Sequence, residues 1–101
     1  MRVLVMFDLP SVTREEKKEY RKFRRFLIKS GFIMMQESIY TKLTLNQNQS
    51  ASIEKSIYLN RPKNGLVQML TITEKQFAKI RYIVGENKSE FLDTDDRMII
   101  L

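Results

Sequence analysis

The stretch that most constrains this chain is its N-terminal apolar run, which ends on an acid shortly before a proline. Residues 2 to 8 read RVLVMFD, and their β-branched and apolar content predicts a strand. Successive side chains of a strand point to opposite faces. One face carries Val3, Val5 and Phe7, and the other carries Leu4, Met6 and Asp8. Both faces are therefore apolar, apart from Asp8 at the tip.

A strand of this kind needs cover on both sides. An antiparallel sheet with helices on one side normally shows a polar outer face. Here an uncovered face would leave an apolar patch on the surface, so we expect a second copy of the chain to stack sheet against sheet. The sequence thus predicts a homodimer.

The next segments predict a helix, an extended region and a weaker helix. Thr13 and Glu16 match a capping box, and the helix that follows is expected to end at Gly31. Residues 32 to 45 are extended in character, but the polar stretch QES in their middle indicates either a kink or a break into two strands. The second helix is expected at about residues 51 to 59, because its apolar positions have helical spacing.

The last third of the chain predicts a strand at LVQMLTI, a short helix through about Lys79 and a further extended stretch, RYIVG. Thr73 and Gln76 repeat the capping-box pattern. This order predicts an α+β, ferredoxin-like fold, with an antiparallel sheet and helices on one face. We expect the domain to span residues 1–85, followed over residues 86–101 by an acidic connector and a C-terminal strand, RMIIL. That strand needs an edge to pair with, either on its own sheet or on the partner's sheet.

Two missing residue types limit the chemistry. The chain of 101 residues has no cysteine and no histidine, which excludes disulfides, zinc–thiolate sites and Ser-His-Asp triads. Any metal must be held by oxygen ligands, which favours magnesium, manganese or calcium. No apolar run approaches the roughly 20 residues of a membrane span, so we expect a protein of the cytoplasm with no membrane partner.

Positive charge is concentrated in the first expected helix. Residues 13 to 31 contain eight Lys/Arg and three Glu, so they carry +5 of the net charge of +6. An ordinary solvated helix face, which is the alternative interpretation, usually alternates the two signs. A polyphosphate backbone is the partner that such a helix favours, because Lys and Arg release condensed counterions from it. The candidate nucleic-acid contacts are Arg14, Lys17, Lys18, Arg21, Lys22, Arg24, Arg25 and Lys29.

Asp8 has two interpretations. An aspartate at the end of a strand often satisfies backbone donors in a turn. Alternatively, the twofold axis of a dimer could bring two Asp8 side chains together to hold a divalent cation, which would polarise a phosphodiester and activate water. No second acid lies in helix or strand register with Asp8.

Taken together, these segments resemble the CRISPR-associated protein 2 family. The resemblance is carried by RVLVMFDLP, YRKFRRFLIKSGF, MMQESIYTKL and LVQMLTITEKQFAKI, and is closest to members from loci with a single large interference nuclease. It implies a ferredoxin-like homodimer whose C-terminal strand reaches across to the other subunit, with Mg²⁺ or Mn²⁺ between paired strand-end aspartates. Asp8 occupies that position as the catalytic and metal-binding residue. Phe7 stands where many members have tyrosine, and we expect it beside the site.

The resemblance also assigns further positions and two classes of activity. The Ser-x-aromatic element of the family maps to Ser38 and Tyr40, which we expect beside the site, and its late helix positions map to Arg24 and Arg25. Family members are described as metal-dependent endonucleases acting on RNA or duplex DNA. They also bridge two CRISPR integrase dimers during spacer acquisition. For this chain we rank the adaptation role above the nuclease, and keep a purely architectural or a regulatory dimer as alternatives.

Overall fold

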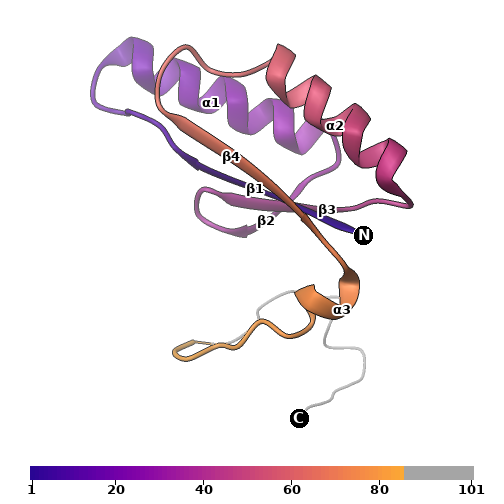
Figure 1. Cartoon of the computed structure of the whole chain (residues 1–101). Coiled ribbons are helices and arrows are strands. Elements are labelled where there is room, and N and C mark those ends of the chain that lie inside the picture. Colours follow the sequence, from indigo (N-terminus) through magenta and orange to yellow (C-terminus); the bar gives the residue numbers. More distant parts are fainter. Residues whose placement is uncertain (86–101) are drawn as a thin grey trace.

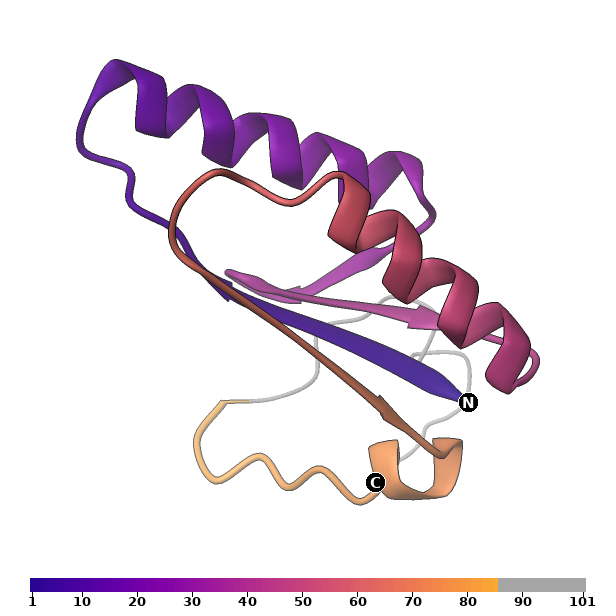
Figure 2. The same cartoon turned by 45° about the horizontal axis from the view of Figure 1, so that its top comes forward.

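The computed structural model describes residues 1–85, which form a four-stranded antiparallel sheet in the order β2-β3-β1-β4. The elements are β1 (Arg2–Asp8), α1 (Arg14–Lys29), β2 (Ile33–Gln36), β3 (Ile39–Leu43), α2 (Gln47–Leu59), β4 (Leu66–Ile72) and α3 (Glu74–Phe77). Helices α1 and α2 cover the same face of the sheet (Figures 1 and 2). The predicted ferredoxin-like α+β fold is confirmed.

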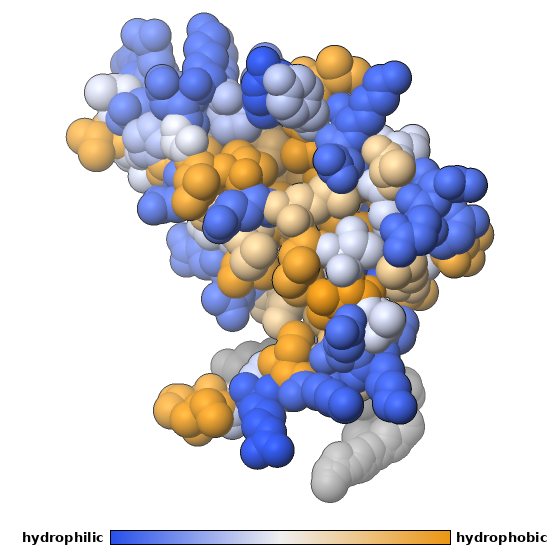
Figure 3. All heavy atoms as spheres, viewed as in Figure 1, coloured by the Kyte–Doolittle hydropathy of each residue, from blue (hydrophilic) through white to orange (hydrophobic). Residues whose placement is uncertain are grey.

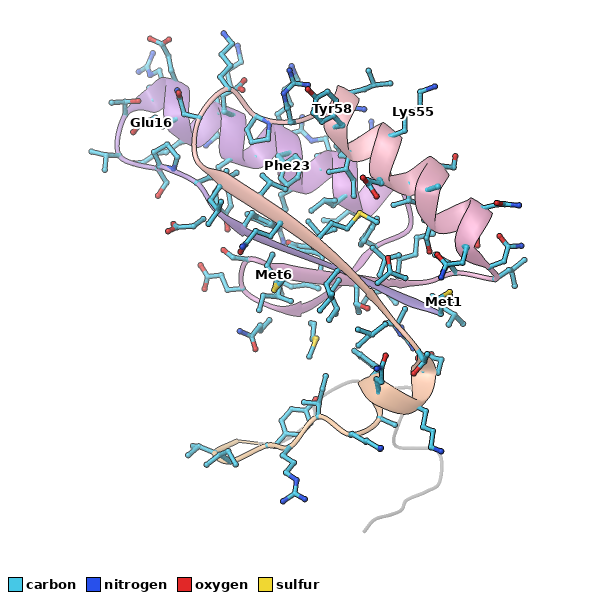
Figure 4. The ribbon with its side chains drawn as sticks, in the orientation of Figure 1. Met1, Met6, Glu16, Phe23, Lys55 and Tyr58 are labelled. Carbon is cyan, nitrogen blue, oxygen red and sulfur yellow. The ribbon has the colours of Figure 1, made fainter. Side chains whose placement is uncertain are left out.

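Strand β1 lies in the middle of the sheet, paired antiparallel with β3 on one side and β4 on the other. Its face toward the helices is the core: Val3 and Val5 are fully buried, and Phe7 is 6% exposed. Phe23 and Leu27 of α1 close the core from above. In Figure 4, Phe23 lies between α1 and the strands, whereas Met6 lies on the other side of the sheet. The alternation predicted for β1 is therefore present.

Helix α1 begins at the predicted capping box. The Thr13 hydroxyl accepts a hydrogen bond from the Glu16 N–H at 3.1 Å, and the Glu16 carboxylate accepts from the backbone N–H groups of Thr13, at 2.9 Å, and Val12, at 3.0 Å. These backbone donors, with that of Thr13 the stronger influence, lower the pKa of Glu16 below its ordinary value of 4.5. The predicted box at Thr73 is also formed, with Gln76 as its partner.

The extended region between the helices is two strands rather than one kinked strand. β2 ends at Gln36 and β3 begins at Ile39. Between them Ser38 has a φ of 68°, a left-handed conformation that turns the chain back on itself. This resolves the alternative that the QES stretch left open.

One predicted boundary and one predicted element were wrong. α2 begins at Gln47 and not near residue 51, because Asn46 caps it: the Asn46 side chain accepts from the Gln49 N–H at 2.9 Å, and Gln49 accepts from the Leu45 N–H at 2.7 Å. Residues 81–85 are neither helix nor strand. The acidic connector and C-terminal strand expected at residues 86–101 lie outside the described residues.

The sheet face away from α1 and α2 carries many apolar side chains, with Arg2, Thr41 and Gln68 among its polar ones. The strand pairing places Leu4 and Met6 of β1 beside residues of both neighbouring strands on this side. Leu43, Leu66 and Leu70 are about half exposed, at 54%, 53% and 49%. We call this surface the outer face, defined by Leu4, Met6, Ile39, Leu43, Leu66 and Leu70.

None of the helices in residues 1–85 is long and apolar enough to cross a membrane.

Gly65 is expected to be far less tolerant of substitution than Gly85. Both have a positive φ, but a Cβ on Gly65 would lie 2.7 Å from Leu9 Cδ2 and 2.8 Å from the Asp8 carbonyl oxygen, whereas one on Gly85 would meet nothing within 4 Å. We predict that Gly65→Ala lowers the free energy of unfolding by about 3 kcal/mol, and Gly85→Ala by about 1 kcal/mol. Denaturant titration measures both. Equal losses would contradict the close approach of Gly65 to the end of β1.

The capping box also predicts a pH dependence. A carboxylate whose pKa is lower in the folded than in the unfolded chain stabilises the fold above its unfolded pKa, and this contribution is lost as the pH falls through the folded value. The difference in unfolding free energy between the wild-type protein and Glu16→Gln should therefore be largest above pH 4.5 and shrink below it. Glu54→Gln on α2 serves as the control, and a difference that grows in acid would contradict this assignment.

Candidate nucleic-acid interface and metal centre

Asp8 ends β1 on the side of the outer face, with an exposed side chain. Within residues 1–85 its carboxylate accepts no hydrogen bond and forms no ion pair. The turn interpretation required Asp8 to satisfy nearby backbone donors, and no such bond is present in residues 1–85. Its position is fixed instead through the backbone, by pairing with Leu66 and by the close approach of Gly65. The carboxylate is therefore free to bind a ligand.

Asp8 lines a surface hollow of about 430 Å³ between the end of β1, the first turns of α1 and the β2–β3 turn. The lining residues are Asp8, Leu9, Ser11, Lys17, Tyr20, Arg21, Glu37 and Ser38. The structure thus brings together four residues that the sequence analysis predicted separately as site or nucleic-acid contacts: Asp8, Ser38, Lys17 and Arg21. A carboxylate beside two cations in one hollow is an arrangement that can hold a phosphate and a divalent cation at the same time.

Glu37 is the residue of this hollow that the sequence analysis missed. Among residues 1–85 no acid is paired with Asp8 in the sheet, because the paired residues of β1 and β3 end at Met6 and Ile39. The Phe7 N–H donates to the Ser38 carbonyl at 3.0 Å, which holds the β2–β3 turn beside the end of β1, and Glu37 of this turn lines the same hollow as Asp8. Only the pairing of β1 with β3, a contact between distant parts of the chain, could have revealed this acid.

Phe7 and Tyr40 do not line the hollow. They are 6% and 1% exposed and belong to the core. Their rings stack with centroids 5.7 Å apart, and Phe23 meets Phe7 edge-on at 5.3 Å. We expected both residues beside the site; the structure places them beneath it, where they support the end of β1.

All eight basic candidates lie on α1, and all are exposed. In Figure 3 hydrophilic side chains gather over α1, whereas apolar ones cover much of the middle of the molecule. None of the eight forms an ion pair within residues 1–85, where the one salt bridge joins Arg2 to Glu74. Seven of them also make no side-chain hydrogen bond in this part of the chain; Arg24 is the exception, and donates to Tyr40. Their charge is thus available to an external anion.

The donor set of the hollow fits a hard divalent cation. Among the described residues no group of three or more acids, histidines or cysteines could enclose a metal ion. Mg²⁺ does not need such a cage, because it is usually bound by one or two carboxylates, with waters and substrate phosphates as its other ligands. Asp8 and Glu37 supply carboxylates of this kind at one hollow.

The sequence as a whole matches known proteins. A family profile described as "CRISPR associated protein Cas2" covers residues 1–80. The chain belongs to the Cas2 family. The Cas2 proteins named CRISPR-associated endoribonuclease Cas2 from Treponema denticola and Streptococcus mutans are 55% and 46% identical to it over 101 residues, covering the whole chain and 100% and 93% of their own lengths. The recognition from sequence segments is confirmed.

The fold also has a solved counterpart in the Cas2 family. The crystal structure of Streptococcus pyogenes Cas2 at pH 6.5 matches with a TM-score of 0.62, covering 84% of this chain and 100% of that chain, at 15% sequence identity. At this identity the likeness concerns the fold alone, and it agrees with the ferredoxin-like arrangement of the sheet and helices.

Proposed function

We propose that this protein is a CRISPR adaptation factor that acts as a homodimer in the prokaryotic cytoplasm, binding duplex DNA and bridging integrase dimers during spacer acquisition. We further propose that it cleaves phosphodiesters in RNA or DNA with the help of Mg²⁺ or Mn²⁺. The observation that carries both proposals is the hollow in which Asp8 lies with Lys17 and Arg21 of the basic helix. The printed name of the Treponema and Streptococcus relatives, endoribonuclease, supports the cleavage.

Helix α1 is the proposed binding surface for nucleic acid. Its cations are exposed, unpaired in residues 1–85 and spread over sixteen residues of one helix, a length of about 24 Å at 1.5 Å per residue. Contacts of this type read the phosphate backbone and not the base sequence. The protein would therefore bind duplexes of any sequence, as a factor that handles new spacers must.

The outer face is the proposed dimer interface. Its leucines Leu43, Leu66 and Leu70 are about half exposed, and an apolar face of this kind is stabilised when a second copy removes it from water. A twofold axis through this face would place the Asp8 ends of two β1 strands on the same assembly. It would also leave both α1 helices, which lie on the opposite side of the sheet, facing outward and accessible to nucleic acid.

In the cleavage reaction the residues of the hollow have separable tasks. Asp8 and Glu37 would hold the cation, which supplies Lewis-acid polarisation of the phosphodiester and a more acidic water. Lys17 and Arg21 would bind the non-bridging phosphate oxygens and stabilise the negative charge that develops there. The Ser38 backbone, fixed by its hydrogen bond from Phe7, would keep the β2–β3 turn and hence Glu37 beside Asp8. No histidine is needed for this scheme.

Asp8→Asn separates the catalytic from the architectural proposal. The amide keeps the size of the side chain but lacks its charge, so we expect cleavage with Mg²⁺ or Mn²⁺ to fall by about 100-fold or more while duplex affinity is retained. Glu37→Gln should weaken Mn²⁺ binding, measured by calorimetry, by about 10-fold. Glu54→Gln on α2 is the matched control. Integration that survives in Asp8→Asn would identify scaffolding as the main function, and cleavage unchanged in Asp8→Asn would overturn the metal site.

Charge reversal on α1 tests the binding surface. Lys18→Glu with Arg25→Glu should weaken duplex binding, and the slope of log K against log salt should become shallower by about 0.9 for each phosphate that is no longer neutralised. Lys55→Glu, a single charge reversal on α2, is the control (Figure 4). Affinity measured by fluorescence anisotropy at several salt concentrations gives the slopes. If the slope is unchanged, α1 is not the binding surface.

A further inference from the structure

Arg24 is set apart from the other seven cations of α1 by a hydrogen bond within the protein. Its Nε–H donates to the Tyr40 hydroxyl at 2.8 Å. The other seven cations make no side-chain hydrogen bond within residues 1–85, so their long side chains are held only at the helix backbone. The Arg24 side chain is therefore held at its guanidinium group as well as at the helix backbone.

Tyr40 is a rigid acceptor for this bond. The residue is 1% exposed, and its ring stacks on Phe7 with centroids 5.7 Å apart. Its backbone lies in β3, paired with Val5 on one side and Met34 on the other. A phenol held by the core and by two neighbouring strands has few conformations, so the position of its hydroxyl is set by the fold.

The geometry leaves the outer end of the guanidinium available. Arginine has five N–H donors, and the bond to Tyr40 uses the one on Nε, so the four donors on the two terminal nitrogens remain. Arg24 is an exposed residue, which places these donors at the surface. Terminal amino groups of this kind can form two parallel hydrogen bonds with the oxygens of one phosphate.

Arg24 also continues the row that borders the Asp8 hollow. Residues three, four and seven positions apart share one side of a helix, and Arg24 stands in these relations to Arg21, Tyr20 and Lys17, all of which line the hollow. A polynucleotide whose phosphate occupies the hollow would thus pass Arg24 with a neighbouring phosphate.

We propose that Tyr40 is a positioning residue for nucleic-acid binding. Its hydroxyl holds the Arg24 guanidinium in the orientation that binds a backbone phosphate next to the Asp8 hollow. This role deepens the nucleic-acid-binding function proposed above and rests on it. Fixing a long side chain before binding reduces the conformational entropy that is lost when the side chain binds the phosphate.

Tyr40→Phe removes the hydroxyl and leaves the stacked ring. We expect the affinity of this variant for duplex DNA to fall about 3- to 10-fold at a fixed salt concentration. The salt slope should stay unchanged, because no charge has been removed. Tyr58→Phe is the control: its ring also lies against an arginine, with Arg61 4.1 Å from its centroid, but it lies on α2. Unfolding curves of both variants verify that they are folded at the temperature of the assay.

A double-mutant cycle distinguishes positioning from a general structural effect. Arg24→Gln should lower both the affinity and the salt slope, and Tyr40→Phe added to it should cause no further loss. A change from Tyr40→Phe that is equally large with and without Arg24 would overturn the proposal, as would no change in the single variant. If Arg24→Gln does not fold, Arg24→Met replaces it, and Tyr40→Phe is again expected to cause no further loss, because methionine has no N–H donor for the Tyr40 hydroxyl.

A failure of the role proposed for Tyr40 can be distinguished from a failure of the proposed nucleic-acid binding. If the wild-type protein binds no duplex, or binds it without dependence on salt, nucleic-acid binding itself is wrong. If the wild-type protein binds and Arg24→Gln weakens it while Tyr40→Phe does not, the binding function stands and only the role of Tyr40 is overturned.

Discussion

The rest of this structure depends on the burial of β1 in the middle of the sheet. Val3 and Val5 are fully buried, and the strand is hydrogen-bonded along both edges. The hydrophobic effect places this apolar strand where it meets both neighbouring strands and the two large helices. Because Asp8 is the last residue of the same strand, the position of the proposed metal ligand is fixed by the most buried part of the protein.

The core and the candidate site share residues around the end of β1. Phe7 points into the core against Tyr40, while the next residue, Asp8, is exposed at the hollow. Tyr40 in turn joins the core to Arg24 on the surface of α1. The packed aromatic residues are thus directly linked to the groups that would contact nucleic acid: Phe7 precedes Asp8 in the chain, and Tyr40 is hydrogen-bonded to Arg24.

Particular residues mark how far sequence reasoning reached. The capping boxes at Thr13 and Thr73 were predictable because their partners lie three residues away, and both are present. The start of α2 was missed although Asn46 and Gln49 carry a similar signal, since the apolar spacing began later than the cap. Glu37 was out of reach, because its place beside Asp8 depends on the register between β1 and β3.

By itself the sequence determined the order and type of the elements, the concentration of positive charge on α1 and the acid at the end of β1. These features depend on propensity, periodicity and contacts between residues close in the chain, which are local. Only the tertiary structure decided that Glu37 and Ser38 join Asp8 at one hollow with Lys17 and Arg21, that Tyr40 is buried and that Arg24 is bound to it. Contacts between residues far apart in the chain are set by strand register and by the packing of α1 on the sheet. Neither can be predicted from a short stretch of sequence.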